Sequence, residues 1–238
     1  MMSSYKVVLT GGPCGGKTES LPFLKHKLVS RGMKVIIISE TARALLSLNY
    51  MPGDNIPYFD FQNLLFKIQF IKEYLNENSA NIAICDRGLL DAKIYMDNND
   101  FQNLLYQNRV KEKEITSTYD VALYYRTIAY EYPETFQRKR IYELPELGIK
   151  RDKKSLEIWN SKLLKTSYSN FGGFENKKKY LYETLVNYID SLDVTQVVSL
   201  SDYYSQDIIP FLLTGINKIM DDNKVPEDIQ IKTRRLIK

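Results

Sequence analysis

Histidine is nearly absent from this chain, with His26 the single example in 238 residues. This scarcity counts against His-rich metal sites and against a Ser-His-Asp triad, which needs an imidazole beside its nucleophile. Cysteine is scarce as well. Cys14 and Cys85 cannot build a disulfide framework, and a low cysteine content fits a reducing compartment. We expect both to be small buried residues rather than a redox pair.

Long apolar runs are also missing. No segment approaches the roughly 20 apolar residues that span a bilayer. The first apolar run, Val7 to Leu9, is too short for a secretory signal. We therefore expect a cytoplasmic protein, with peripheral attachment to membranes as an open alternative. A net charge of +4, spread along the chain, gives no support to nucleic-acid binding.

What the sequence does contain is an alternation of strand and helix patterns. Its length suits one α/β domain, or one domain with a small appendage. Short apolar, β-branched segments predict five buried strands, at residues 5–10, 34–39, 81–86, 121–125 and 194–200. Apolar residues at helical spacing predict helices at 18–30, 61–77, 89–97, 153–164, 176–192 and 204–221. This order predicts a parallel sheet with right-handed crossovers.

A glycine-rich segment between the first strand and the first helix matches G-x-x-x-x-G-K-[ST] in full. Glycines let backbone N–H groups point inward as an anion nest, and the helix N-terminus adds partial positive charge. We expect Lys17 to bridge the β- and γ-phosphates of ATP or GTP, and Thr18 to ligate Mg2+. The predicted nucleotide-binding residues are Gly11, Gly12, Pro13, Cys14, Gly15, Gly16, Lys17 and Thr18.

Acidic residues end two of the predicted strands, where ligands of parallel sheets bind. Asp86 is predicted to be a magnesium ligand of Walker-B type, and the alternative is a helix N-cap. Arg87 follows it and either reaches a phosphate or pairs with a carboxylate. Glu40 is a candidate base that takes the proton of an acceptor hydroxyl in a small-molecule kinase. The alternative is an acid that favours the start of the next helix.

A basic segment runs from Arg138 to Lys154, with seven basic and three acidic residues. We predict a mobile lid in which Arg140 and Arg151 neutralise charge on the transferring phosphoryl group. Two alternatives stay open. One is a solvated basic loop, and the other is a surface for anionic membranes, to which each nearby Lys or Arg contributes about 1 kcal/mol.

These motifs together resemble the NadR/TRPL-translocation-defect type of AAA-like P-loop domain. The resemblance covers residues 5 to 165 and includes Trp159, which we expect to be a core residue. It implies a P-loop NTPase fold: a kinase-like three-layer α/β sandwich with a five-stranded parallel sheet and a basic lid. The segments that carry it are 5–18, 39–42, 85–92, 140–143 and 151–152.

The resemblance also implies function, and its branches differ. One branch phosphorylates nicotinamide riboside. The other resembles a GTP-binding trafficking protein that also binds phosphoinositides, and the opening strand and the Cys-Asp-Arg-Gly run are closer to it. We therefore expect a Mg2+-dependent ATP- or GTP-binding switch or slow NTPase, whose partner is a phosphoinositide membrane or a protein. The alternatives are a nucleoside kinase and a degenerate nucleotide binder, and intact Lys17, Thr18 and Asp86 count against the last.

Three features depart from the family pattern. Glu19 stands where a second Thr is usual, and residues 165–193 form an extended segment with basic Lys177, Lys178 and Lys179. The tail resembles the opening strand of a triphosphate-tunnel (CYTH-like) domain. We accordingly expect a P-loop domain at residues 1–224 and, at 225–238, the start of a CYTH-like domain whose remainder the chain lacks.

Overall fold

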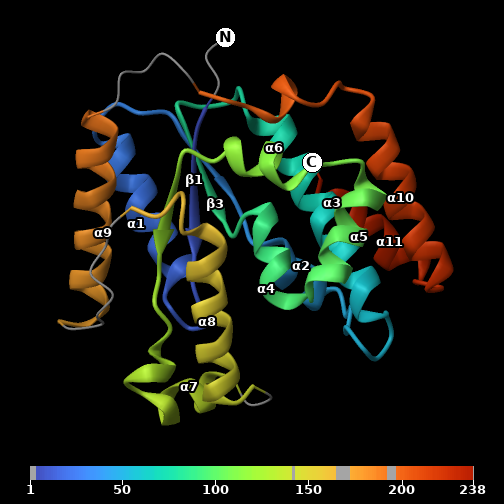
Figure 1. Cartoon of the computed structure of the whole chain (residues 1–238), viewed down its shortest axis with the longest axis horizontal. Coiled ribbons are helices and arrows are strands. Elements are labelled where there is room, and N and C mark those ends of the chain that lie inside the picture. Colours follow the sequence, from blue (N-terminus) through green and yellow to red (C-terminus); the bar gives the residue numbers. More distant parts are fainter. Residues whose placement is uncertain (1–3, 141–142, 165–171, 192–196, 238) are drawn as a thin grey trace.

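Four parallel strands form the sheet in the computed structural model, which describes residues 4–140, 143–164, 172–191 and 197–237. Their order is β2-β3-β1-β4, so the first strand lies inside the sheet (Figure 1). Val7, Val8 and Leu9 of β1 are fully buried, because helices cover both faces of the sheet. The strands are β1 (Tyr5–Thr10), β2 (Val35–Ile38), β3 (Ile82–Asp86) and β4 (Val121–Tyr124).

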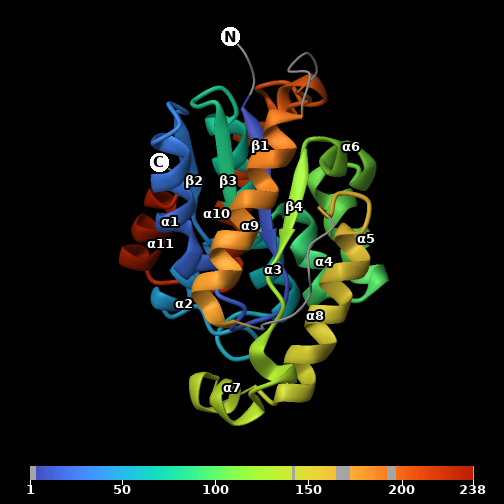
Figure 2. The same cartoon turned by 90° about the vertical axis from the view of Figure 1, so that its left-hand side faces the viewer.

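Helices pack on the two faces in separate layers (Figures 1 and 2). One layer contains α1 (Lys17–Val29) and α9 (Gly173–Asp190), which bury Leu24 and Leu185 against the sheet. The opposite layer is larger. It contains α2 (Thr41–Ser47), α3 (Tyr58–Asn76), α4 (Ala92–Tyr95), α5 (Asn98–Asn108), α6 (Glu112–Ser117), α10 (Ile208–Asp222) and α11 (Glu227–Arg235).

Two further helices, α7 (Pro133–Lys139) and α8 (Pro145–Trp159), project past the carboxyl ends of the strands (Figure 1). Each begins with proline at its first position, where the missing N–H leaves no hydrogen bond unmade. The predicted basic lid is therefore helical along most of its described length, and α8 starts eight residues before the predicted helix at 153–164. Short 3-10 turns at Leu89–Asp91, Ile128–Tyr130 and Leu200–Asp202 complete the described elements.

The predicted fifth strand is wrong. Residues 194–196 of that segment lie outside the described residues, and 197–199 form no strand before a 3-10 turn begins at Leu200. The outer edge of β4 is instead paired by the residues that follow α8. Ala122 donates its N–H to Lys162 O at 2.7 Å, and Leu164 donates to Ala122 O at 3.2 Å. This short parallel bridge covers β4 where an exposed edge would attract other strands.

The strand predicted from the tail's resemblance is also wrong, because these residues form helix α11. Ile229, Thr233 and Leu236 recur at helical spacing, and the two apolar side chains pack on the larger core. Thr233 is fully buried, and its Oγ1 lies 2.8 Å from Tyr50 Oη. The tail thus docks on the body of the molecule, while the division at residue 224 stays a prediction.

Replacing Thr233 by valine tests this docking. Valine keeps the shape of the side chain but leaves the buried Tyr50 hydroxyl without its partner, so we expect a loss of about 1–3 kcal/mol in the free energy of unfolding. Urea denaturation measures the loss, with the exposed neighbour Lys232→Ala as the control. Equal stability of both variants would show that the hydrogen bond does not hold the tail.

Candidate functional site

The glycine-rich loop joins β1 to α1 directly against the end of β4. Gly11 and Gly16 have φ angles of +117° and +91°, which side chains disfavour. A Cβ at Gly11 would lie 2.2 Å from Tyr125 O, and one at Gly15 would lie 2.4 Å from the same atom. Among the described residues, the N–H groups of Cys14, Gly15 and Gly16 have no hydrogen-bond acceptor. The loop is a cradle with free donors, which suits an oxyanion.

Lys17 lies inside this cradle. Its ammonium donates to Gly12 O at 2.6 Å and to Gly11 O at 3.1 Å, and only 7% of the residue is exposed. Burial lowers the pKa of Lys17 to about 7, and the neighbouring Arg87 acts in the same direction. An anionic phosphate in the cradle would favour the charged ammonium and so offset the burial.

Thr18 and Asp86 meet at the mouth of the cradle. β1 and β3 pair with Leu9 opposite Asp86, which places this carboxylate beside the loop. The Thr18 hydroxyl donates to Asp86 Oδ2 at 2.7 Å, while the buried Oδ1 has no hydrogen-bond partner among the described residues. The N-cap of the 3-10 turn that follows β3 is Gly88. Asp86 is therefore not a helix N-cap, the alternative to its role as a magnesium ligand.

These two side chains fit a magnesium ion. The orphaned Asp86 Oδ1 and the Thr18 hydroxyl are hard oxygen donors, and Mg2+ typically takes one or two protein oxygens together with phosphates and water. Burial raises the pKa of Asp86, and the nearby Glu40 adds to the rise. A bound cation would favour the ionised carboxylate. In the described part of the chain, no three His, Cys, Asp or Glu side chains gather as a metal cage.

Glu40 lies between two arginines at the tip of β2. Its Oε1 is 3.5 Å from Arg87 Nε, and its Oε2 is 3.8 Å from Arg43 Nε. Arg87 also donates to Gly11 O at 3.3 Å, and Arg43 donates to Thr18 Oγ1 at 3.5 Å. The Glu40 side chain makes no capping hydrogen bond to α2. The two arginines therefore tie this carboxylate to the cradle and to the metal position.

Arg87 has a φ of +73°, which is unusual for a residue with a side chain. The turn is held by Asp91, whose Oδ2 accepts the Gly88 N–H at 2.9 Å. Asp91 Oδ1 accepts from Thr10 Oγ1 at 3.0 Å and from Trp159 Nε1 at 2.8 Å. Trp159 is fully buried, which confirms it as a core residue. Sequence patterns gave no role to Asp91.

Asp152 is a second residue whose role the sequence patterns do not predict. This fully buried carboxylate of α8 accepts the Gly12 N–H at 2.6 Å and the Thr127 N–H at 3.0 Å. Its other oxygen accepts from the Tyr124 hydroxyl. It fixes the first turn of the cradle to the end of β4. The sequence feature that distinguishes Asp152 is that it is an acidic residue within a basic run.

The two predicted lid arginines share one carboxylate, Glu143, but differ in their other contacts and in exposure. Arg151 lies over the Tyr95 ring at 4.9 Å, and Arg87 lies 5.6 Å from the same ring, so Arg151 belongs to the site. Its Nη1 is 2.6 Å from Glu143 Oε1. Arg140 has a side chain that is 47% exposed and pairs with Glu143 at 3.9 Å. Residues 141–142 of the predicted lid lie outside the described residues.

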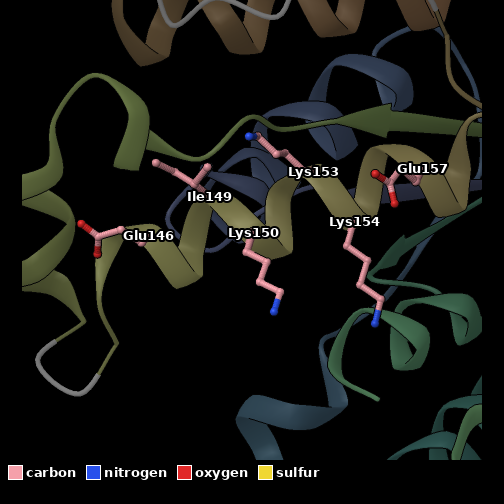
Figure 3. Close-up of a pocket in the computed structure, with 6 residues that line it drawn as sticks. All are labelled: Glu146, Ile149, Lys150, Lys153, Lys154 and Glu157. Atoms are coloured by element: carbon pink, nitrogen blue, oxygen red, sulfur yellow. The ribbon is translucent and has the colours of Figure 1, made fainter. Parts of the chain in front are cut away.

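The other basic residues of α8 do not converge on one point. They border a surface hollow of about 430 Å³, where Lys153 points away from Lys150 and Lys154 (Figure 3). Lys154 donates to Met96 O at 2.6 Å. Glu146 and Glu157 line the same hollow, so its charge is mixed. The described basic residues of the lid therefore divide between Arg151 at the site and other arginines and lysines at the surface.

Comparisons with known proteins agree with the fold. A family model described as "AAA domain" matches residues 6–160. A solved deoxyadenosine kinase from M. mycoides, with product dCMP and a flexible dCDP bound, is similar in fold. It is 17% identical, the match covers 79% of this chain and 100% of that chain, and the TM-score is 0.57. A search of curated proteins found no match. None of the described helices combines the length and apolarity that crossing a membrane requires.

Replacing Lys17 by alanine tests the cradle. A nucleotide at 100 times its dissociation constant adds about 2.7 kcal/mol of stability to the native state. We expect Lys17→Ala to abolish this gain with Mg-ATP and Mg-GTP while the apo protein stays folded, because the charge that faces the phosphates is lost. Thermal unfolding with and without nucleotide measures it, and exposed Lys25→Ala on the same helix is the control. Undiminished stabilisation of the Lys17 variant would refute the assignment.

Proposed function

Because this chain belongs to the AAA-domain family of P-loop proteins, we propose that it is a kinase that phosphorylates a hydroxyl group of a small molecule. The observation that carries the proposal is the position of Glu40. Arg43 lies near this carboxylate and donates a hydrogen bond to Thr18, and Arg87 lies near it and donates to the carbonyl of Gly11 in the loop. Glu40 occupies the N-cap position of α2 but makes no side-chain capping hydrogen bond there, and its side chain is 22% exposed, so an acceptor can reach it.

The donor is a nucleoside triphosphate in the cradle. Lys17 and the free N–H groups of the loop bind its phosphates, and Thr18 and Asp86 hold Mg2+. The ion would supply positive charge that neutralises the phosphate oxygens. Arg151 lies over the Tyr95 ring, which Arg87 also approaches, and adds positive charge beside the site. Both ATP and GTP fit this part of the proposal.

In the transfer step, Glu40 takes the proton from the acceptor hydroxyl. The hydroxyl oxygen forms a bond to the γ-phosphorus as the bond between that phosphorus and the β–γ bridging oxygen breaks. The products are a phosphorylated acceptor and a nucleoside diphosphate, and Glu40 carries the proton. Arg87 orients the carboxylate through its contact with Oε1. Orientation of this kind lowers the activation barrier of the transfer, because the carboxylate loses less conformational entropy when the transition state forms.

The acceptor class that we propose is a nucleoside. The solved structure with a similar fold is a deoxyadenosine kinase, and one branch of the resembling domains phosphorylates nicotinamide riboside. At 17% identity the likeness supports the fold and leaves the acceptor to experiment. A panel of deoxynucleosides, ribonucleosides and nicotinamide riboside is the first set to test, with ATP and GTP as donors.

Glu40→Gln tests the catalytic base. Glutamine keeps the size of the side chain but cannot take a proton, so we expect kcat to fall by about 10²–10⁴. Affinity for the Mg-nucleotide should change by less than about threefold. Release of nucleoside diphosphate in the presence of each acceptor gives the rate, and calorimetry gives the affinity.

Exposed Glu19→Gln is the matched control and should keep wild-type turnover. A Glu40→Gln enzyme with full turnover would exclude the base. Diphosphate release that no acceptor accelerates would exclude the kinase and favour a slow NTPase.

A second candidate is a GTP-dependent trafficking switch that binds phosphoinositide membranes. One observation favours it: Arg138, Lys139 and Arg140 are all exposed at the end of α7. This helix stands at the tip of the molecule, away from the sheet (Figure 2). A basic tip of this kind suits an anionic surface.

Neutralising the three α7 residues to glutamine separates the two candidates. If they belong to a lid, we expect turnover to fall about tenfold with little change in nucleotide affinity. Sedimentation with phosphoinositide-containing and neutral vesicles measures membrane binding in parallel. A variant with Lys25, Lys113 and Lys218 neutralised controls for net charge. Loss of vesicle binding with intact turnover would favour the membrane candidate and contradict the lid.

A further inference from the structure

Helix α9 reaches the cradle from the face of the sheet opposite to α3. Lys177, in its second turn, donates from Nζ to Gly15 O and to Arg126 O, each at 2.9 Å. One turn earlier, the Phe174 ring lies 2.3 Å from where a Cβ at Gly16 would be. Helix α9 therefore contacts Gly15 and Gly16, the two residues that directly precede Lys17 in the motif.

The contact at Gly15 bears on phosphate binding because of the covalent structure of the chain. The Gly15 C=O and the Gly16 N–H belong to one planar peptide group and point in opposite directions. A cation on the oxygen therefore holds the N–H toward the other side of the group. It also polarises the peptide, which makes that N–H a stronger donor. This is one of the free donors of the cradle.

We propose that Lys177 is a positioning residue of the nucleotide site, which fixes and polarises the Gly15–Gly16 peptide for a bound polyphosphate. The proposal rests on nucleotide binding in the cradle and not on the role of Glu40. It also gives a function to α9, the described helix of the extended segment. Failure of the kinase proposal would leave it standing, since its test measures affinity rather than turnover.

The surroundings of Lys177 predict a pH signature. Burial lowers the pKa of Lys177 to about 8, Asp152 and Glu131 act against this shift, and Arg126 acts with it. The Tyr125 ring lies 5.6 Å from Nζ. Polyphosphate in the cradle adds negative charge nearby and raises the pKa of the amine in the complex. Binding then takes up a proton above pH 8, so affinity falls as pH rises through that value.

The experiment compares the full chain with Lys177→Met, Lys177→Arg and the exposed control Lys179→Met. Calorimetry gives the affinity for whichever of Mg-ATP and Mg-GTP the wild type binds, and for Mg-tripolyphosphate, between pH 7 and pH 9.5. At pH 7 we expect Lys177→Met to weaken both ligands by the same factor of about tenfold. An equal effect on tripolyphosphate identifies the phosphates as the part that Lys177 serves.

The arginine variant separates positioning from support of the fold. Arginine stays charged throughout this range, so Lys177→Arg should bind at pH 7 within about threefold of wild type. Between pH 8 and pH 9.5 its affinity should decline about tenfold less than that of wild type, because the contribution of Lys177 is missing. Any pH dependence of affinity that is the same in all variants comes from groups that all of them contain, such as Lys17. Wild-type affinity in Lys177→Met, even with a lower melting temperature, would overturn the proposal. The same pH profile in Lys177→Arg and wild type would overturn it as well.

Discussion

A buried ammonium in a loop of backbone groups is the constraint on which the rest of the site depends. Lys17 is removed from water, and two carbonyl groups of its own loop accept its hydrogen bonds. Such burial is costly unless the charge is compensated. Asp86, Glu40 and Asp91 all act to keep Lys17 charged, against burial and Arg87. The carboxylates around the cradle therefore stabilise the charged form of Lys17, and a phosphate that enters the cradle would stabilise it further.

The shape of the cradle is set by groups far away in the sequence. Asp152 binds the N–H of Gly12 across 140 residues, and Lys177 binds the carbonyl of Gly15 across 162 residues. An anion thus holds a donor at one end of the loop, and a cation holds an acceptor at the other. Between them, Tyr125 O leaves no room for a Cβ at Gly11 or Gly15. The motif specifies a flexible loop, and the helices beside it give that loop one conformation.

This division explains what the sequence could predict. The cradle, the four confirmed strands and the helices α1, α3, α9 and α10 follow from local patterns, because turn glycines and apolar periodicity act within a few residues. The same patterns do not predict α5, α6, α7 and α11. Pairing is not local. Val197 and Val198 belong to a strand-like pattern, yet Leu163 pairs with Ala122 at the edge of β4. The roles of Asp91, Asp152 and Lys177 depend on which helices contact the loop, and local sequence patterns do not specify those contacts.

Two carboxylates near one polyphosphate require an explanation, because each adds repulsion. Asp86 is buried at the metal position, and burial with Glu40 nearby raises its pKa. Glu40 stays partly exposed, and two arginines offset its charge. A protein that only held a nucleotide would be better without this second acid. Sites that deprotonate an acceptor need a carboxylate free to take a proton beside one committed to a cation. The position of Glu40 between Arg43 and Arg87 is therefore the feature on which the proposed transfer rests.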